Sequence, residues 1–127
     1  LHPIPRRQRQ MCIRDRSKAV DFSIQANVEC TLINCSHADI ASNSIRELAR
    51  TPKFGIFANS STFKEIDLSI STKDVDAIHH LNSEIISAKE YAKIALNWAK
   101  EGAFVVGGCC GTTVEHTKQI KLLLETL

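Results

Sequence analysis

Two adjacent cysteines, Cys109 and Cys110, follow an apolar stretch and stand between glycines. The stretch 103–106 is typical of a short buried strand, and two glycines follow it, then the cysteines and a third glycine. Neighbouring side chains of a regular strand point to opposite faces, so the two thiols could not share a ligand there. Glycine allows backbone angles that turn both thiols toward one point. The pattern therefore predicts a metal site, with two buried cysteines that pack as small apolar side chains as the alternative.

A third cysteine, Cys35, also follows an apolar stretch, at 30–33. Three thiolates would hold Zn²⁺ at about 2.3 Å each and leave a fourth coordination position open, which is typical of catalytic rather than structural zinc. A substrate thiol that binds at such a position loses its proton and becomes a nucleophile at neutral pH. The chemistry that these residues predict is alkyl transfer to a substrate thiol.

Two other residues could close the site as a fourth ligand. Cys30 lies five residues before Cys35, and an odd separation in a regular strand places two side chains on opposite faces. His37 is closer, and we expect it in the first turn of the following helix, near the metal but not bound to it. The remaining histidines of this region are expected in a solvated loop (His79 and His80) and at the surface or behind the ligands (His116). A site closed by Cys30 or His37 would be a structural, non-enzymatic zinc site.

Hydrophobic periodicity predicts alternating helices and strands. The expected elements are a helix ending near Gln25, a strand at 30–33, a helix from Ser36 to about Arg50, a strand at 54–58, a long loop at 64–86 with at most one helical turn, a helix from Ser87, a strand at 103–106 and a helix from Thr112 to the end.

Capping signals support the helices. Capping boxes are predicted at Ser36 with Asp39, at Ser87 with Glu90 and at Thr112 with Glu115, and Gly102 is expected in a left-handed conformation after the third helix. The side chains expected to face the core are Ile40, Ile45, Leu48, Tyr91, Ala95, Trp98, Ala99, Ile120, Leu123, Leu124 and Leu127. The last helix would also place its positive N-terminus close to the two cysteines, which favours thiolates.

Alternation of this kind predicts an α/β fold with a parallel sheet and right-handed crossovers. In such folds the chemistry lies at the carboxyl ends of the strands. All three predicted strands end in polar or sulfur residues, namely Asn34-Cys35, Asn59-Ser60-Ser61 and Cys109-Cys110. These three segments are therefore expected to meet at one edge of the sheet.

Charge is unevenly distributed along the chain. The formal net charge of +2 depends on five arginines in residues 1–16, because residues 17–127 hold 11 basic and 13 acidic residues and have a net charge of −2. Without the first segment there is no basic surface for nucleic acid. No apolar run approaches the roughly 18 residues that span a membrane, and no secretory signal is evident. Five cysteines, an odd number, do not predict a disulfide framework and suit a cytoplasmic, metal-binding protein.

The first segment differs from the rest in a second way. Residues 10–16 resemble the translation of a transposon-end adapter used in shotgun DNA libraries. This resemblance implies that residues 1–16 are not native and that residues 17–127 form the folded part. A natural basic arm is the alternative.

Residues 107–116, Gly-Gly-Cys-Cys-Gly-Thr-Thr-Val-Glu-His, resemble the closing motif of the zinc-dependent homocysteine S-methyltransferases, most of which have proline at the position of Val114. Residues 32–35 resemble the family's Asn-Cys element, with Leu32 in place of a glycine. Residues 58–61 match a third element only at Asn59 and Ser60, and lack its glycine and glutamate.

This resemblance implies zinc on Cys35, Cys109 and Cys110, contacts to substrate from Asn34 and Asn59, and methyl transfer to homocysteine to form methionine. The methyl donor varies in the family between S-methylmethionine, S-adenosylmethionine, betaine and a methylfolate-derived methyl group. The implied fold is a (β/α)₈ barrel. Because a barrel needs about 250 residues and only three strands are predicted here, the chain is expected to be the C-terminal part of one. A redox-active or nucleophilic cysteine protein is a third reading, which the absence of Cys-x-x-Cys disfavours.

Overall fold

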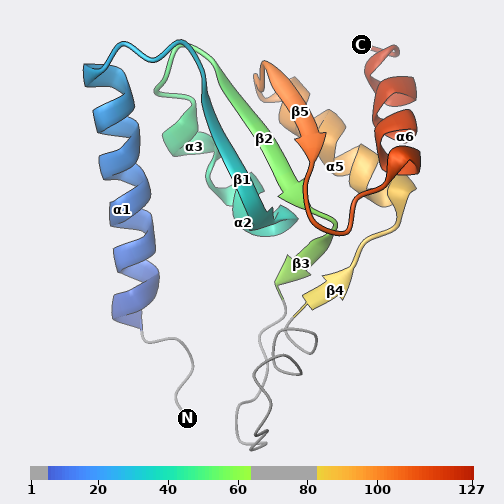
Figure 1. The fold of residues 1–127 in the computed structure, drawn as a ribbon, viewed down its shortest axis with the longest axis horizontal. Helices are drawn as coiled ribbons and strands as arrows, with labels where there is room; N and C mark the ends of the chain where they lie inside the picture. The colour runs from blue at the N-terminus through green and yellow to red at the C-terminus, as the bar shows by residue number, and fades with distance from the viewer. Residues whose placement is uncertain (1–5, 64–82) are drawn as a thin grey trace, which may run out of the picture.

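The computed structural model describes residues 6–63 and 83–127 (Figure 1). Its helices and strands, in chain order, are α1 (Arg6–Gln25), β1 (Thr31–His37), α2 (Ala38–Asn43), α3 (Ile45–Leu48), β2 (Phe54–Asn59), β3 (Ser61–Phe63), β4 (Ser83–Ile85), α5 (Ala88–Lys100), β5 (Val105–Gly108) and α6 (Val114–Leu124). None of the helices within these ranges combines the length and the apolar character that crossing a membrane requires.

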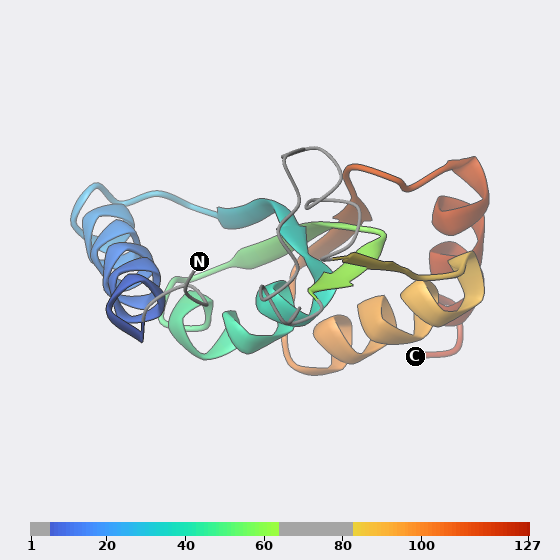
Figure 2. The same ribbon diagram turned by 90° about the horizontal axis from the view of Figure 1, so that it is seen from below.

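Three of the strands form a parallel sheet in the order β1-β2-β5, which confirms the predicted α/β class and the parallel arrangement. Helices α2, α3 and α5 lie on one face of this sheet, and α6 packs beside α5 (Figures 1 and 2). A second, two-stranded antiparallel sheet, β3-β4, continues from the carboxyl end of β2. The strand β2 is therefore the central strand of the parallel sheet and leads directly into the second sheet.

The pattern of β2 shows how the core is built. Phe54, Ile56 and Ala58 are almost fully buried beneath the helices, and the residues between them face the other side of the sheet. One of those is Gly55, where an added Cβ would lie 2.2 Å from Cδ2 of Leu32 and 2.4 Å from Cγ1 of Val105. Glycine is required there because the side chains of the two flanking strands close over it.

Helix α5 agrees with its predicted boundaries. Ser87 is the N-cap, and its Oγ accepts a hydrogen bond from the backbone N–H of Glu90 at 3.3 Å. The buried stripe comprises Tyr91, Ala92, Ala95 and Trp98, while Ala99 is half-buried. Gly102 has a φ of +108°, the left-handed conformation predicted for it.

The helix predicted from Ser36 to Arg50 is wrong in two respects. Ser36 lies in β1 rather than at a cap, and the helix divides into α2 and α3 at Ser44. The buried Ser44 hydroxyl donates to the carbonyl oxygen of Ile40 at 2.8 Å and accepts from Arg16. A serine that bonds back to a carbonyl four residues earlier competes with the helical ladder, which explains the break. Ile45 and Leu48 are buried as predicted, whereas Ile40 is half-buried.

Other boundaries also differ from the prediction. The last strand is 105–108 rather than 103–106, and residues 83–85 form a strand within the segment that was expected to be a loop. Residues 61–63 form a strand that the sequence did not predict. Leu127, predicted to be in the core, is 66% exposed, while Ile120 is buried and Leu123 and Leu124 are half-buried. The expected loop residues His79 and His80 lie outside the described residues.

Candidate metal centre

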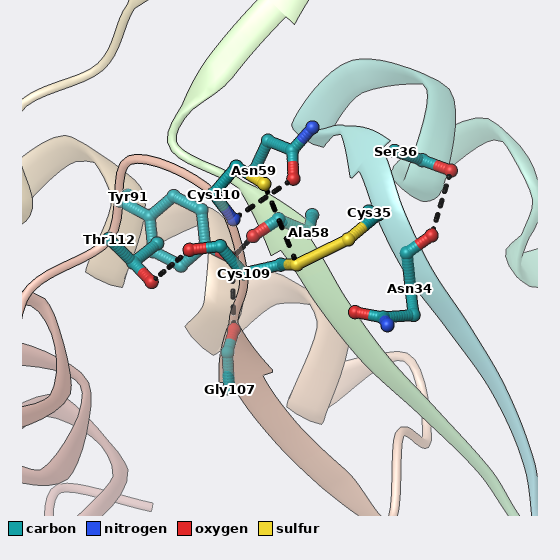
Figure 3. Close-up of a disulfide and its surroundings, with 10 residues drawn as sticks. All are labelled: Asn34, Cys35, Ser36, Ala58, Asn59, Tyr91, Gly107, Cys109, Cys110 and Thr112. Carbon is teal, nitrogen blue, oxygen red and sulfur yellow. Dashed lines mark hydrogen bonds between the residues drawn. A yellow bond between two sulfur atoms is a disulfide. The ribbon is translucent and has the colours of Figure 1, made fainter.

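The sulfur atoms of Cys35, Cys109 and Cys110 lie within 4.8 Å of one another at the carboxyl end of the sheet (Figure 3). Cys35 comes from β1, and the other two directly follow β5. These strands do not pair with each other, because β2 lies between them. The sulfurs therefore meet across the carboxyl-terminal part of β2, beside Ala58 (Figure 3).

Cys35 reaches this position through an irregularity of β1. Asn34 pairs with Phe57 and His37 with Asn59, so one extra residue of β1 is accommodated between these pairs. Cys35 lies in this bulge with a φ of +52°, a left-handed conformation that is uncommon for a residue with a side chain. In a regular strand Cys35 would share the helix-covered face with Ile33, which packs against the core. The bulge turns its thiol toward Cys109 instead, and a strained backbone of this kind is typical of functional sites.

Several hydrogen bonds hold the segment 109–112 in place. The backbone N–H of Cys109 donates to the carbonyl oxygen of Ala58 at 2.9 Å, and that of Cys110 donates to Oδ1 of Asn59 at 3.2 Å. The carbonyl oxygen of Cys109 accepts from the N–H of Thr112 at 3.1 Å and from its Oγ1 at 2.7 Å. The two cysteines are thus attached to the end of β2 on one side and to the start of α6 on the other.

The glycines around the cysteines act differently from the prediction. Only Gly111 has a positive φ, +76°. At Gly107 an added Cβ would lie 2.7 Å from the ring of Phe57, and at Gly108 one would lie 2.5 Å from Oγ1 of Thr112. Those two positions need glycine because neighbouring side chains approach closely, and the expectation that their backbone angles turn the thiols is wrong.

Cys35 and Cys109 are joined by a disulfide, with their Cα atoms 5.6 Å apart (Figure 3). The odd number of cysteines did not predict this bond, and the expectation of no disulfide is wrong for this pair. A disulfide sulfur has no charge to offer a cation, so the bonded and the metal-binding states of these residues are alternatives. Cys110 is exposed, and its Sγ lies 4.0 Å from Sγ of Cys109.

The cluster of three sulfurs could hold a metal ion such as zinc once Cys35 and Cys109 are reduced. With Zn–S distances of about 2.3 Å, two sulfur ligands of one ion are about 3.8 Å apart. The 4.0 Å between the sulfurs of Cys109 and Cys110 is close to that spacing. The N-cap of α6, Thr113, follows Cys110 by three residues.

The hydroxyl of Tyr91 bridges β2 and β5 just before the cysteines. Its hydroxyl lies 2.8 Å from the carbonyl oxygen of Ala58 and 2.9 Å from that of Gly107, and shares its single proton between them. Desolvation by burial raises the pKa of Tyr91 to about 12. The sequence predicted Tyr91 only as part of an apolar stripe, because periodicity says nothing about where a hydroxyl finds its partner.

The other candidate ligands lie elsewhere. Cys30 precedes β1, at the opposite end of that strand from Cys35, which corresponds to about 16 Å along an extended chain. His37 ends β1, and its Nδ1 lies 2.8 Å from Oγ of Ser61. His116 is buried at the start of α6, not at the surface, and the predicted capping pair Thr112 and Glu115 is replaced by Thr113 and His116.

The two asparagines predicted to contact substrate flank the thiols. Asn34 directly precedes Cys35, and its carbonyl oxygen lies 3.5 Å from Oγ of Ser36. Asn59 uses its side-chain oxygen to hold the N–H of Cys110, as described above, a contact that the sequence did not predict. Ser60, which was expected at this edge without a stated role, is 3% exposed and contacts both the cysteine segment and His116. Its position in a polar strand end was the available signal.

A known protein family matches this chain. The model of the family described as homocysteine S-methyltransferase matches residues 8–124, which include all three clustered cysteines and nearly the whole chain. The chain therefore belongs to the homocysteine S-methyltransferase family.

Proposed function

We propose that this chain carries the zinc-binding part of an S-methyltransferase that methylates the thiol of homocysteine and forms methionine. The observation that supports this most directly is the meeting of three cysteine sulfurs at the carboxyl end of a parallel sheet, in a chain that belongs to this family. The proposed ligands are Cys35, Cys109 and Cys110, with the fourth position left for substrate. Zinc held there would lower the pKa of a substrate thiol so that it reacts as a thiolate at neutral pH.

The residues of the chain bind and orient the reacting sulfur. The homocysteine thiol gives its proton to solvent, and its sulfur attacks the methyl carbon of the donor from the side opposite the leaving group. The new S–C bond forms as the bond from methyl to donor breaks, and the electron pair of that bond stays on the donor. Asn34 and the Nδ2 group of Asn59 lie beside the thiols and are the proposed contacts to the amino acid part of the substrate. Such an arrangement accelerates the reaction mainly by holding the two reactants in line.

We infer further that the three parallel strands belong to a (β/α)₈ barrel. Within the described residues β1 and β5 each pair on one side only, with β2, so each leaves an edge on which further barrel strands would pair. Methyl transfer also needs a donor site, which the family fold would supply from other strands. We therefore expect the 127-residue chain alone to form little methionine, and a rate typical of complete enzymes would contradict this inference. A reducing compartment such as the cytoplasm suits the proposal, because the thiols must stay reduced.

The open coordination position can be tested on the chain as it is. The protein is reduced with a phosphine, which does not bind as a thiol does, and is loaded with Co²⁺ as a spectroscopic substitute for zinc. Addition of homocysteine should change the absorption bands of the ion, since a sulfur ligand replaces water. Methionine, which has no free thiol, is the matched control and should leave the bands unchanged. A spectrum insensitive to homocysteine would indicate a closed structural site and would overturn the proposal.

A further inference from the structure

A buried hydrogen bond joins two residues that lie next to the metal centre but are not ligands. Nε2 of His116, in the first turn of α6, lies 2.9 Å from Oγ of Ser60, which follows β2. Ser60 is 3% and His116 8% exposed. The ring of Tyr91 packs edge-on against the imidazole, with the centroids 5.6 Å apart. A buried hydrogen bond between residues so distant in sequence forms only when the chain has folded, and it helps to define that fold.

The partners of His116 determine where its proton lies. The backbone N–H of Thr113, which can only donate, lies 3.1 Å from Nδ1, so Nδ1 is an acceptor. Nε2 therefore carries the hydrogen and donates it to Ser60, a tautomer that we assign from the hydrogen-bond network. The Ser60 hydroxyl in turn donates to the carbonyl oxygen of Ile86 at 2.7 Å. Every group in this chain of contacts has its complementary partner.

The same serine holds the second of the adjacent cysteines. The backbone N–H of Ser60 donates to the carbonyl oxygen of Cys110 at 2.9 Å, and its own carbonyl accepts from the N–H of Ile86 at 3.1 Å. The segment from Cys110 to Thr113 is thus fixed at both ends, by Ser60 and by His116. Between them Gly111 takes its left-handed turn with 3.6 Å from the position of an added Cβ to Cβ of Ser60.

We propose that His116 is a positioning residue for the metal centre. Through its Nε2–H it ties the first turn of α6 to Ser60, and Ser60 fixes the backbone of Cys110 and hence the direction of its thiol. This rests on the proposed function to the extent that Cys110 is a metal ligand. Outer contacts that orient a ligand typically contribute 10- to 100-fold in metal affinity.

Two substitutions test the roles of the two imidazole nitrogens of His116 one at a time. His116→Gln places an amide N–H near the position of Nε2 and keeps a donor for Ser60, but loses the acceptor for Thr113. His116→Asn keeps an acceptor near the position of Nδ1 and cannot reach Ser60. Ser60→Ala removes the same contact from the other side. Lys118→Ala, at an exposed position of α6, is the matched control.

The measurements are Co²⁺ affinity and spectrum of the reduced chain, and amide hydrogen exchange at Ser60 and Cys110 in the metal-free protein. We expect His116→Asn and Ser60→Ala to bind Co²⁺ about tenfold or more weakly, with altered bands and faster exchange at both amides. We expect His116→Gln to restore these properties largely, and Lys118→Ala to match the parent chain.

Equal behaviour of the Asn and Gln variants, or a Ser60→Ala variant that matches the parent chain, would overturn the proposal. If His116→Asn does not fold, the comparison of His116→Gln with Ser60→Ala decides. Failure of the proposed function would give a different result. The Co²⁺ bands would then not respond to homocysteine, while the differences in Co²⁺ affinity and amide exchange among these variants would remain. Amide hydrogen exchange at Ser60 and Cys110 tests the role of His116 even if the chain binds no metal.

Discussion

The side-chain oxygen of Asn59 lies 3.2 Å from the backbone nitrogen of Cys110 and accepts its hydrogen bond. A residue that the sequence suggested as a substrate contact therefore also holds a proposed metal ligand. The contact links the end of β2 to the segment after β5, two neighbouring strands whose carboxyl ends meet at the site.

This contact predicts a change in metal binding when Asn59 is replaced. Asn59→Ala should lower Co²⁺ affinity on the order of tenfold, because the N–H of Cys110 loses the acceptor that orients it. Asn59→Asp keeps an acceptor and should bind metal more tightly than Asn59→Ala. Competition with a chelator under reducing conditions measures both. If Asn59→Ala binds Co²⁺ as tightly as the parent chain, Asn59 does not orient Cys110, and only the proposed contact to substrate remains.

The thiols make a second prediction. Cys35→Ser, Cys109→Ser and Cys110→Ser should each lose bound zinc, because serine removes a soft, charged ligand. Cys30→Ser should retain zinc and cost only about 1 kcal/mol of stability, since it lies at the other end of β1. Elemental analysis of the four reduced proteins measures this. Loss of zinc in Cys30→Ser would point to a closed site.

Reduction itself is part of that experiment. Because Cys35 and Cys109 form a disulfide, the untreated chain should bind less zinc than the chain reduced beforehand. Free thiol counts before and after reduction provide the control for every cysteine variant.

A third prediction concerns the effect of Gly108→Ala on metal affinity and stability. Gly108→Ala places a methyl group 2.5 Å from Oγ1 and 2.7 Å from Cβ of Thr112, so the threonine must move and lose its hydrogen bond to the Cys109 carbonyl. Metal affinity and stability should both fall. Gly102→Ala is the control, because its strain comes from a φ of +108° far from the thiols; it should cost about 1 kcal/mol and leave metal affinity unchanged. Equal metal affinity in the two variants would contradict this account.

Tyr91 predicts a loss of stability in alkali. Its pKa is raised from 10.0 to about 12 in the folded chain, so above pH 10 the unfolded chain loses the proton while the folded chain keeps it. The unfolded state then binds fewer protons, and the free energy of unfolding falls as pH rises from 10 to 12, by on the order of 2 kcal/mol. Tyr91→Phe, measured by denaturant titration at each pH, should lack this part of the decline. Parallel curves for the two proteins would contradict it.

The N-terminal segment gives a fifth prediction. Removal of residues 1–16 should leave zinc content and solubility unchanged, because the segment resembles an adapter and its charge differs from the rest of the chain. Arg16 contacts Ser44, so a small loss of stability is expected. Arg16→Ala in the full chain is the control for that contact. A clear loss of zinc or solubility on deletion would indicate a native segment.

Much of this protein follows from local pattern. The parallel α/β class, helix α5 with its Ser87 cap, the left-handed Gly102 and the strand β2 were all predictable, since each depends on periodicity or on the neighbouring few residues. The motif at 107–116 also indicated the family that the comparison then matched. Boundaries at 36–50 and 103–108 were less predictable because a buried Ser44 and the register of β5 decided them.

Only the tertiary structure decided how the cysteines meet. Sequence spacing placed Cys35 on a strand end, but a bulge and a left-handed backbone turn its thiol toward Cys109. The contacts of Asn59, Ser60, Tyr91 and His116 depend on side chains that are distant in sequence and converge through the order β1-β2-β5. A sequence pattern determines which side chains an element can present, whereas the pairing of the elements determines which of those side chains touch.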